Sequence, residues 1–494
     1  YLVKDLCNFA KHRPFFYNHA TWLAFVCSGL FLLHPVQTQT VSYVIQARLE
    51  GLSSFFLLAT LLAYAHMAKV TSWWAKVLLG FCVGFLGLLA SGTKEIVVVM
   101  PFLIVLIDWF FISQEQWDLF KKRFFVVGTA CLAFALIVLH YMGWRFIYDV
   151  ASLHMSTTNN RGNILTPNAF DVITPGWFLI SEFKVLLHYL LIFVWPLGLS
   201  VEYDWKLASK FLSFEVLFPL VILASLMVFV VRSMWLKKNT ALTFGLLWFF
   251  ITMAPRTTII PSPELLCDYK TYLASVGMML ILASALVYVF DAIFAIARRA
   301  IDTLFSHEVQ LAVLTCVLLC IGVGAYQRNT VWETNVAFWE DNARKAPNKA
   351  RVHNNLGVAL SEAGRVDEAL VAYQKAISLD AYYADPLSNI AVAYSMKNDI
   401  DKAIESLKGA VRICPNYPEA FNNLGSLFLQ KKAYEDAEQA LHVATQLRPY
   451  YGKAYYNLAR LHEEKGDRNK AWDYLKRATE GDLDIPEIFF KFGQ

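Results

Sequence analysis

Nine apolar stretches in the first two thirds of the chain constrain its fold more than any other feature. Each approaches the roughly 20 apolar residues that a helix needs to cross a bilayer. Their predicted ranges are 18–35, 51–68, 77–92, 96–113, 124–143, 213–232, 240–257, 272–292 and 308–326. Because 57% of the 494 residues are hydrophobic, too large a share for a soluble protein of this size, the stretches predict a multi-pass α-helical membrane domain over residues 1–326.

One further apolar segment, 178–196, carries Glu182, Lys184 and His188 in its middle. A charged side chain that faces lipid at the centre of a bilayer costs at least ~2.5 kcal/mol. We therefore predict an interfacial or re-entrant helix that does not cross.

The basic residues predict which side of the membrane each loop faces. With nine crossings, one side receives Lys4, Lys11, Arg13, Lys69, Lys76, Lys121, Lys122, Arg123, Arg232, Lys237, Lys238, Arg298 and Arg299. The short loops on the other side receive only Arg48, Lys94, Arg256 and Lys270. By the positive-inside rule the first side is cytoplasmic, so the segment 144–212 and everything after residue 326 lie outside the cytoplasm. A net charge of +4 without a long basic run argues against nucleic acid as a partner.

Residues 350–485 repeat with a period of 34. Asparagine recurs at Asn355, Asn389, Asn423 and Asn457, and alanine recurs in step at Ala369, Ala403, Ala437 and Ala471. This period and pattern predict four tetratricopeptide repeats. A linker or capping helix is expected at 327–349, and the start of a fifth repeat or a cap at 486–494. Because the chain opens with Tyr1 rather than Met, we expect part of its N-terminal region to be missing.

Stacked helical pairs form a long concave groove, so the array predicts a surface that binds a protein or peptide. In related arrays the equivalent asparagine lies in the groove and bonds to the backbone of an extended peptide. That resemblance implies a peptide-binding groove lined by Asn355, Asn389, Asn423 and Asn457. The alternative is that each asparagine only caps or braces its own helix pair.

Four polar loops fall on the predicted outer face, at residues 34–39, 93–95, 202–205 and 261–272. Each has an ordinary explanation by itself: a histidine at a helix end usually meets water or a carbonyl, and lysine beside glutamate can form a neutral interfacial pair. Together, if they converge in space, they describe an active site at the membrane surface better than an inert anchor.

The order of these motifs resembles a known family. The strings HPVQTQTVSYV, a Thr-Lys-Glu turn, PLGLSVEYDW, IIPSPELLCDYKTYLAS and AYQRNTVW leading into repeats are similar to the transmembrane-and-tetratricopeptide-repeat family, especially its bacterial members. That family resembles protein O-mannosyltransferases of the GT-C fold, which move a sugar from a polyprenyl-phosphate carrier to exported proteins. The resemblance implies an all-α chain: a GT-C-like polytopic domain followed by a repeat solenoid.

The resemblance also implies which residues bind the lipid phosphate and the donor. They are His34, Gln37, Lys94, Glu95, Asp204, Asp268, Lys270 and Tyr272. In the family motif, written acid-His-Arg-x-Tyr-Leu-Pro-Ser, the arginine meets the lipid phosphate. Here Lys270 replaces that arginine, which keeps the charge but loses the bidentate fork.

The catalytic acid of such enzymes lies on an earlier external loop, so the catalytic residue of this chain is unknown. No metal-ligand spacing is visible, although a divalent metal could take part.

Three functions follow from these patterns. The first is a membrane glycosyltransferase whose repeats bind the acceptor protein. The charge bias and the family resemblance predict that it lies in a bacterial inner membrane with the repeats in the periplasm. The second is a non-catalytic scaffold or assembly subunit that binds a partner complex through its repeats. A transporter or channel is disfavoured because no span carries a repeated set of buried charges.

Overall fold

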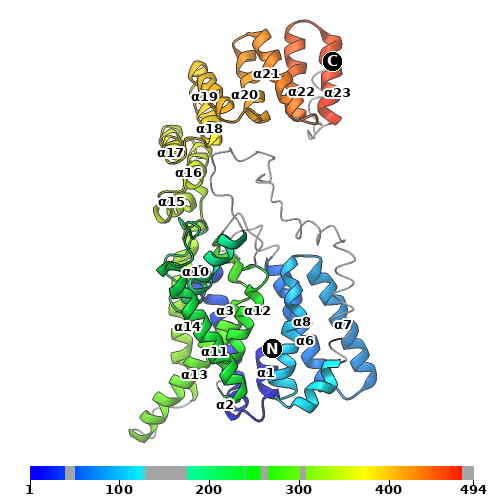
Figure 1. Cartoon of the computed structure of the whole chain (residues 1–494), viewed down its shortest axis with the longest axis vertical. Helices are drawn as coiled ribbons and strands as arrows, with labels where there is room; N and C mark the ends of the chain where they lie inside the picture. Colours follow the sequence, from blue (N-terminus) through cyan, green and yellow to red (C-terminus); the bar gives the residue numbers. More distant parts are fainter. Residues whose placement is uncertain are drawn as a thin grey trace. The chain divides into compact units, whose positions relative to one another are not determined.

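The computed structural model describes residues 1–38, 50–125, 128, 175–238, 240–257, 265–300 and 307–480. These residues fall into two units, one ending at Glu333 and the other beginning at Thr334. Every regular element in the described ranges is helical, and Figure 1 shows helices throughout both units. The predicted all-α fold class is confirmed.

Long apolar helices dominate the first unit. The elements are α1 Leu2–Phe9, α2 Pro14–Asn18, α3 Ala20–Leu33, η1 Pro35–Gln37, α6 Leu52–Lys69, α7 Trp73–Ser91, η3 Glu95–Val99, α8 Met100–Ile107, η4 Asp108–Ile112, α10 Pro175–Val194, α11 Phe214–Trp235, α12 Thr240–Met253, η5 Asp268–Thr271, α13 Ser275–Ala300, α14 His307–Asn329 and η6 Thr330–Trp332.

Each predicted span except 124–143 coincides with one or more of these helices. Most of 124–143 lies outside the described residues. Six are long and apolar enough to cross a bilayer: Leu52–Lys69, Trp73–Ser91, Gly176–Val194, Phe214–Trp235, Ser275–Phe294 and Leu311–Trp332. Three shorter apolar helices, Ala20–Leu33, Ile96–Ile112 and Thr240–Met253, accompany them. The chain is therefore a multi-pass membrane protein.

Polar side chains of the first unit gather at the two ends of its helices. At the end where α6 finishes, Lys69 pairs with Asp5 at 2.5 Å and Arg13 pairs with Glu115 at 2.9 Å. We call the opposite end, where α3 finishes and α6 and α13 begin, the outer end. It contains the described parts of the four polar loops.

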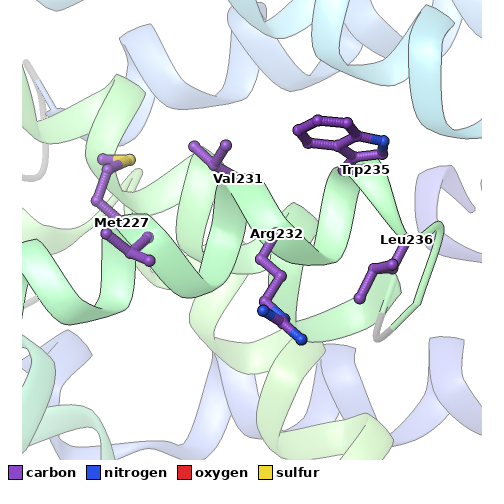
Figure 2. Close-up of a pocket in the computed structure, with 6 residues that line it drawn as sticks. Met227, Val231, Arg232, Trp235 and Leu236 are labelled. Carbon is purple, nitrogen blue, oxygen red and sulfur yellow. The ribbon is translucent and has the colours of Figure 1, made fainter.

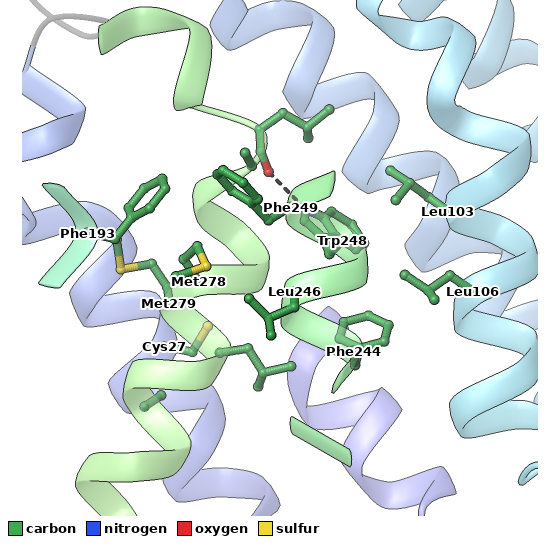
Figure 3. Packing of buried hydrophobic residues seen from close by; sticks show 14 of the residues in the cluster. Cys27, Leu103, Leu106, Phe193, Phe244, Leu246, Trp248, Phe249, Met278 and Met279 are labelled. Carbon is green, nitrogen blue, oxygen red and sulfur yellow. Dashed lines mark hydrogen bonds between the residues drawn. The ribbon is translucent and has the colours of Figure 1, made fainter. Parts of the chain in front are cut away.

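Helices α12 and α13 cross at two glycines. A Cβ added at Gly245 would lie 2.6 Å from the carbonyl oxygen of Gly277, and one added at Gly277 would lie 2.7 Å from that of Gly245. Only a residue without a side chain allows two backbones to approach so closely. Beside the crossing, the buried Trp248 donates from Nε1 to the carbonyl oxygen of Leu273 at 2.9 Å (Figure 3). The crossing therefore fixes where α13 begins.

Helix α10 contacts outer-end residues along most of its length. Ser181 accepts a hydrogen bond from a backbone N–H of the following loop at 2.8 Å, Tyr189 bonds to the backbone ahead of α13 at 2.9 Å, and the carbonyl of Phe193 bonds to His34 at 3.0 Å. From Ser181 to Phe193 the helix rises about 18 Å, and it contacts outer-end residues near both ends of this stretch. Its length alone would permit a crossing, but these contacts favour the interfacial placement of 178–196, which stays a prediction.

The second unit is a row of helix pairs. Its elements are α15 Asn335–Lys345, α16 Ala350–Glu362, α17 Val366–Leu379, α18 Ala384–Met396, α19 Ile400–Ile413, α20 Pro418–Gln430, α21 Tyr434–Leu447, α22 Gly452–Glu464 and α23 Arg468–Glu480. The predicted region 486–494 lies outside the described residues.

The 34-residue period sets both the packing and the turns of this unit. A Cβ added at Gly425 would lie 2.5 Å from Leu441, so the first helix of that pair needs a small residue where the second presents a large one. The turn between the paired helices places a residue at positive φ in every repeat, at Gly364, Asn398, Lys432 and Gly466. Glycine adopts that conformation without steric cost, asparagine tolerates it, and lysine adopts it at a cost.

Candidate functional site

Segment 265–275, which leads into α13, is held by side chains from several separate parts of the first unit. Gln37 donates from Nε2 to Oγ of Ser275 at 2.8 Å, and Arg256 donates from Nη1 to the carbonyl of Lys270 at 2.6 Å. Tyr203 donates to Oδ1 of Asp268 at 2.8 Å. The ammonium of Lys94 lies 5.5 Å from the centre of the Tyr269 ring. Residues from all four polar loops therefore meet around this segment.

A buried ionic cluster lies beside the segment. Glu50 is completely buried, and both of its carboxylate oxygens accept hydrogen bonds from Nη2 of Arg256 at 2.5 and 2.6 Å. Lys94 pairs with the same carboxylate through Nζ. The side chains of Lys94 and Arg256 are 16% and 11% exposed, so both are mostly buried but keep some contact with the surroundings. Two cations share one carboxylate, and the cluster carries one excess positive charge.

Asp268 is engaged by the loop after α10. Its Oδ2 accepts from the backbone N–H of Ser200 at 3.0 Å, while its Oδ1 accepts from Tyr203. Burial, followed by the nearby charge of Asp268, raises the pKa of Tyr203 well above its usual value, so the phenol keeps the proton that it donates. Asp268 thus ties the loop to the start of α13.

The polar face of α10 is covered by the same loop. The ammonium of Lys184 lies 4.5 Å from the centre of the Trp205 ring and 3.4 Å from Glu215, and His188 packs edge-on against Tyr203 and Trp205. Glu182, by contrast, is buried, and its Oε1 has no hydrogen-bond partner. Of the three polar residues that argued against a crossing, Lys184 and His188 therefore contact the loop, and Lys184 also pairs with Glu215 of α11.

His34 is bonded through both ring nitrogens. Nε2 lies 3.0 Å from the carbonyl of Phe193, and Nδ1 accepts from the backbone N–H of Val36 at 3.3 Å. This pattern fixes the neutral tautomer with its proton on Nε2. The ring therefore links α3 to α10 and caps η1, and its predicted contact with the donor is not tested by this geometry.

The remaining predicted site residues are placed as follows. Asp204 lies half-buried in the loop after α10, Lys270 is buried, and the Tyr272 ring packs 5.3 Å from that of Phe31. Glu95 begins η3, and its side chain lies outside the described residues, as do residues 39–49 and 258–264. Among the described residues, no group of three or more His, Cys, Asp or Glu side chains is arranged to hold a metal.

Glu50, Tyr203 and Arg256 carry much of this site, yet the sequence did not single them out as site residues. Arg256 gave a weak signal as one of the few basic residues on the predicted outer side. Glu50 gave none, because its partners Lys94 and Arg256 lie 44 and 206 residues away.

A hollow lies on the exposed face of α11, away from the outer end. It is lined by Met227, Val231, Trp235 and Leu236, with the guanidinium of Arg232 at its edge (Figure 2). An apolar surface that ends in tryptophan and arginine is typical of a helix facing lipid near the headgroups. We interpret this hollow as lipid-facing surface.

In the repeats, the predicted asparagines take part in two hydrogen-bonded chains. Asn389 donates to Oδ1 of Asn354 in the preceding repeat at 2.9 Å, and Asn457 donates in the same way to the buried Asn422. These bonds join neighbouring repeats rather than the two helices of one pair. The expected peptide-binding role of the asparagines stays a prediction.

Comparisons with known proteins find matches to the repeats and to most of the chain. Models of the tetratricopeptide repeat match residues 350–383 and 452–482, and a further TPR repeat model matches 396–432. The chain is 24% identical over 402 residues to "Protein O-mannosyl-transferase Tmtc3" of Drosophila melanogaster, covering 72% of this chain and 40% of that protein. It is 25% identical over 365 residues to "Protein O-mannosyl-transferase F38B6.6" of Caenorhabditis elegans, covering 73% and 46%.

The chain therefore spans less than half the length of these curated relatives. Among solved structures, the crystal structure of MamA aligns with this chain at 23% sequence identity and a TM-score of 0.27. The alignment covers 29% of this chain and 85% of the MamA chain.

The fold defines a multi-pass membrane protein that carries an array of tetratricopeptide repeats. Within that class, the two curated relatives and the repeat matches confirm the resemblance to the transmembrane-and-tetratricopeptide-repeat family.

Proposed function

We propose that this chain is a membrane glycosyltransferase that moves a sugar from a polyprenyl-phosphate carrier to a Ser or Thr hydroxyl of an exported protein. Two curated relatives are named as protein O-mannosyl-transferases, which supports a glycosyltransferase-like role. The repeats would bind the acceptor protein.

The observation that carries the proposal is the ionic cluster at the outer end. The carboxylate of Glu50 holds Lys94 and Arg256 in fixed positions, Arg256 also bonds to the backbone carbonyl of Lys270, and the cluster of Glu50, Lys94 and Arg256 has an excess positive charge. Fixed cations stabilise negative charge that develops on a departing phosphate without having to reorganise. A lipid phosphate at the membrane surface is an anion that such a cluster would bind.

In the proposed reaction, the acceptor hydroxyl oxygen attacks the anomeric carbon and the bond from that carbon to the phosphate oxygen breaks. The hydroxyl proton passes to a carboxylate base, expected on a loop earlier than the residues of this site. Asp268 acts here as a positioning residue, because Ser200 and Tyr203 already occupy its oxygens.

We further propose that the outer end and the repeats lie outside the cytoplasm, which in a bacterial inner membrane is the periplasm. The positive-inside distribution supports this orientation. A divalent metal as cofactor is part of the proposal to be tested.

The alternative is a non-catalytic scaffold that binds a partner complex through its repeats. Two observations favour it. The acid of the family motif, Asp268, serves a structural contact, and its neighbour Lys270 replaces the family's arginine.

The deciding experiment incubates the purified full-length protein with labelled polyprenyl-phosphate sugars and a candidate exported protein, with and without Mg²⁺ or Mn²⁺. We expect transfer to the acceptor, its loss in Lys94→Ala and Lys270→Ala, and its retention in Lys121→Ala, which changes a lysine on the predicted opposite side. If no donor supports transfer and the protein co-purifies stoichiometrically with another membrane complex, the scaffold replaces the enzyme.

A further inference from the structure

The end of α11 opposite the outer end is held by two other parts of the first unit. The guanidinium of Arg13 donates through Nη1 to the backbone carbonyl of Lys237, and through Nη2 to both carboxylate oxygens of Glu115 at 2.9 and 3.0 Å. The ammonium of Lys237 donates to the carbonyl of Glu115 at 3.2 Å. We call this end of the helices the inner end. The turn after α11 is therefore fixed there by contacts with the residue before α2 and the turn after η4.

Two exposed tryptophans mark the level of the membrane surface at the inner end. Trp235 is 86% exposed and Trp117 is 56% exposed. They lie two residues from Lys237 and Glu115, respectively, which bond to each other. Tryptophan is enriched where the hydrocarbon core of a bilayer meets the lipid headgroups. These contacts therefore place the turn after α11 at headgroup level without using the positive-inside count.

The hollow on the exposed face of α11 has a volume of about 530 Å³ and leads to this level (Figure 2). It lies between two rows of side chains spaced four residues apart, Met227–Val231–Trp235 and Val228–Arg232–Leu236. Side chains four residues apart are neighbours along one face of a helix, so the two rows enclose a groove that follows the helix. The described residues that line the groove are apolar or aromatic except for Arg232. Such a groove accommodates a lipid acyl chain.

Arg232 brings a positive charge to this groove. It lies about one turn, or roughly 5 Å, before the end of α11. Its side chain is exposed and makes no ion pair with any residue that the structure describes. A charged side chain on a lipid-facing surface is costly unless it reaches the headgroups or a counter-charge. Because a guanidinium forms bidentate hydrogen bonds with a phosphate, the position of Arg232 favours a lipid phosphate as its partner.

The charges beside the groove favour an anionic lipid over a zwitterionic one. Arg232, Lys237 and Lys238 fall within seven residues, and Arg13 adds a fourth cation. In the contacts that the structure describes for these four side chains, Glu115 is the one carboxylate, and Arg13 already bonds to both of its oxygens. The cation of a choline or ethanolamine headgroup would meet like charge here. A headgroup with a net negative charge would not.

We propose that the groove on α11 and the turn after it form a binding site for one anionic phospholipid. An acyl chain lies between the two rows, and the headgroup phosphate bonds to Arg232 beside the turn Lys237–Lys238. On the predicted orientation the site lies in the cytoplasmic leaflet, where anionic lipids give the membrane a negative surface potential. It is at the opposite end of the first unit from the ionic cluster, and it does not depend on the proposed function.

The test counts the lipids bound to the purified full chain by native mass spectrometry, during titration with phosphatidylglycerol or with phosphatidylcholine of the same acyl chains. Each Lys or Arg near an anionic headgroup strengthens binding by roughly fivefold. We therefore expect one phosphatidylglycerol to be held about tenfold or more tighter than phosphatidylcholine. Arg232→Gln removes the charge that faces the groove and should weaken this tight site about fivefold.

Lys76→Gln is the matched control. Lys76 is exposed near the start of α7 and lies on the same predicted side of the membrane as Arg232, so the change removes an equal charge away from the groove. It should leave the tight site intact. Val231→Trp keeps every charge and fills the groove from an exposed position, so it should displace the lipid. This second variant tests the site if Arg232→Gln does not fold.

The outcomes separate a site from a general attraction. A tight site that is lost in Arg232→Gln and in Val231→Trp but kept in Lys76→Gln supports the proposal. Equal weakening by Arg232→Gln and Lys76→Gln would show a diffuse attraction to the basic residues of this end and overturn it. Equal affinity of wild type for the two lipids would overturn the anionic lipid as the occupant. An unchanged tight site in Val231→Trp would overturn the groove as the place of the acyl chain.

Discussion

Both carboxylate oxygens of Glu50 accept hydrogen bonds from Nη2 of Arg256, at 2.5 and 2.6 Å, across 206 residues of sequence. This pair joins the residue just before α6 to the loop after α12. Lys94, in the turn between α7 and η3, pairs with the same carboxylate. Three loops that the sequence separates are thereby fixed at one end of the bundle.

Replacing Glu50 by Gln should destabilise the first unit strongly. The change leaves two partly buried cations without their counter-charge, and breaking a buried ion pair from one side costs about 3–5 kcal/mol. Thermal unfolding in detergent should show a clearly lower Tm. Glu215→Gln is the control, because that carboxylate is 72% exposed and 3.4 Å from its lysine; equal Tm values for the two variants would contradict the buried pair.

The crossing of α12 and α13 should not tolerate a methyl group. In Gly277→Ala the new Cβ would lie 2.7 Å from the carbonyl oxygen of Gly245, so the helices must separate, at a cost of about 1–3 kcal/mol. Gly84→Ala on α7 meets nothing within 4 Å and should be neutral or stabilising, because alanine favours a helix over glycine. Thermal stability of the two purified variants checks this, and a wild-type Tm for Gly277→Ala would mean that the helices do not cross here.

If α10 lies along the outer end, both of its ends should be accessible from outside. In a cysteine-depleted background, Trp177→Cys and Trp195→Cys should react with an impermeant maleimide in intact cells. The two side chains are 37% and 69% exposed. Trp73→Cys, at the start of α7, should react only after permeabilisation. Labelling of positions 177 and 195 from opposite sides would show that α10 crosses.

A glycine at position 432 should stabilise the repeats. Lys432 has φ of 59°, a conformation that costs a residue with a side chain about 1–2 kcal/mol. Lys432→Gly removes that cost, whereas Lys431→Gly, at φ of −80°, only adds freedom to the unfolded chain. Hydrogen exchange of α20 and α21 in the full chain should slow in the first variant and quicken in the second. Identical effects would contradict the difference in backbone conformation.

The asparagine chains allow bracing to be separated from peptide binding. Asn457→Ala removes the donor to the buried Oδ1 of Asn422 and should destabilise the array by about 1–3 kcal/mol. Asn355→Ala removes only an acceptor at 3.4 Å and should have little effect on stability. Denaturant unfolding measures both variants. Loss of acceptor binding in Asn355→Ala with unchanged stability would support the groove, and unchanged binding would favour the bracing role.

The sequence by itself determined the features that depend on local signals. Apolar runs of bilayer length gave the membrane helices, because a helix in lipid must satisfy its own backbone and cover it with apolar side chains. A strict 34-residue period gave the repeats, because every helix pair packs against the next in the same way.

Only the tertiary structure decided which side chains meet. The sequence pointed to Lys94 and Lys270, but not to Glu50, which fixes the first of them. The sequence predicted that His34 binds the sugar donor, whereas in the structure both of its ring nitrogens bond to backbone groups. It could not show that the buried Gln37 donates a hydrogen bond to Ser275, 238 residues further along the chain. The physical reason is that apolar composition specifies that a helix is buried in lipid or protein, but not which neighbour it crosses, and the crossings decide which loop ends share a site.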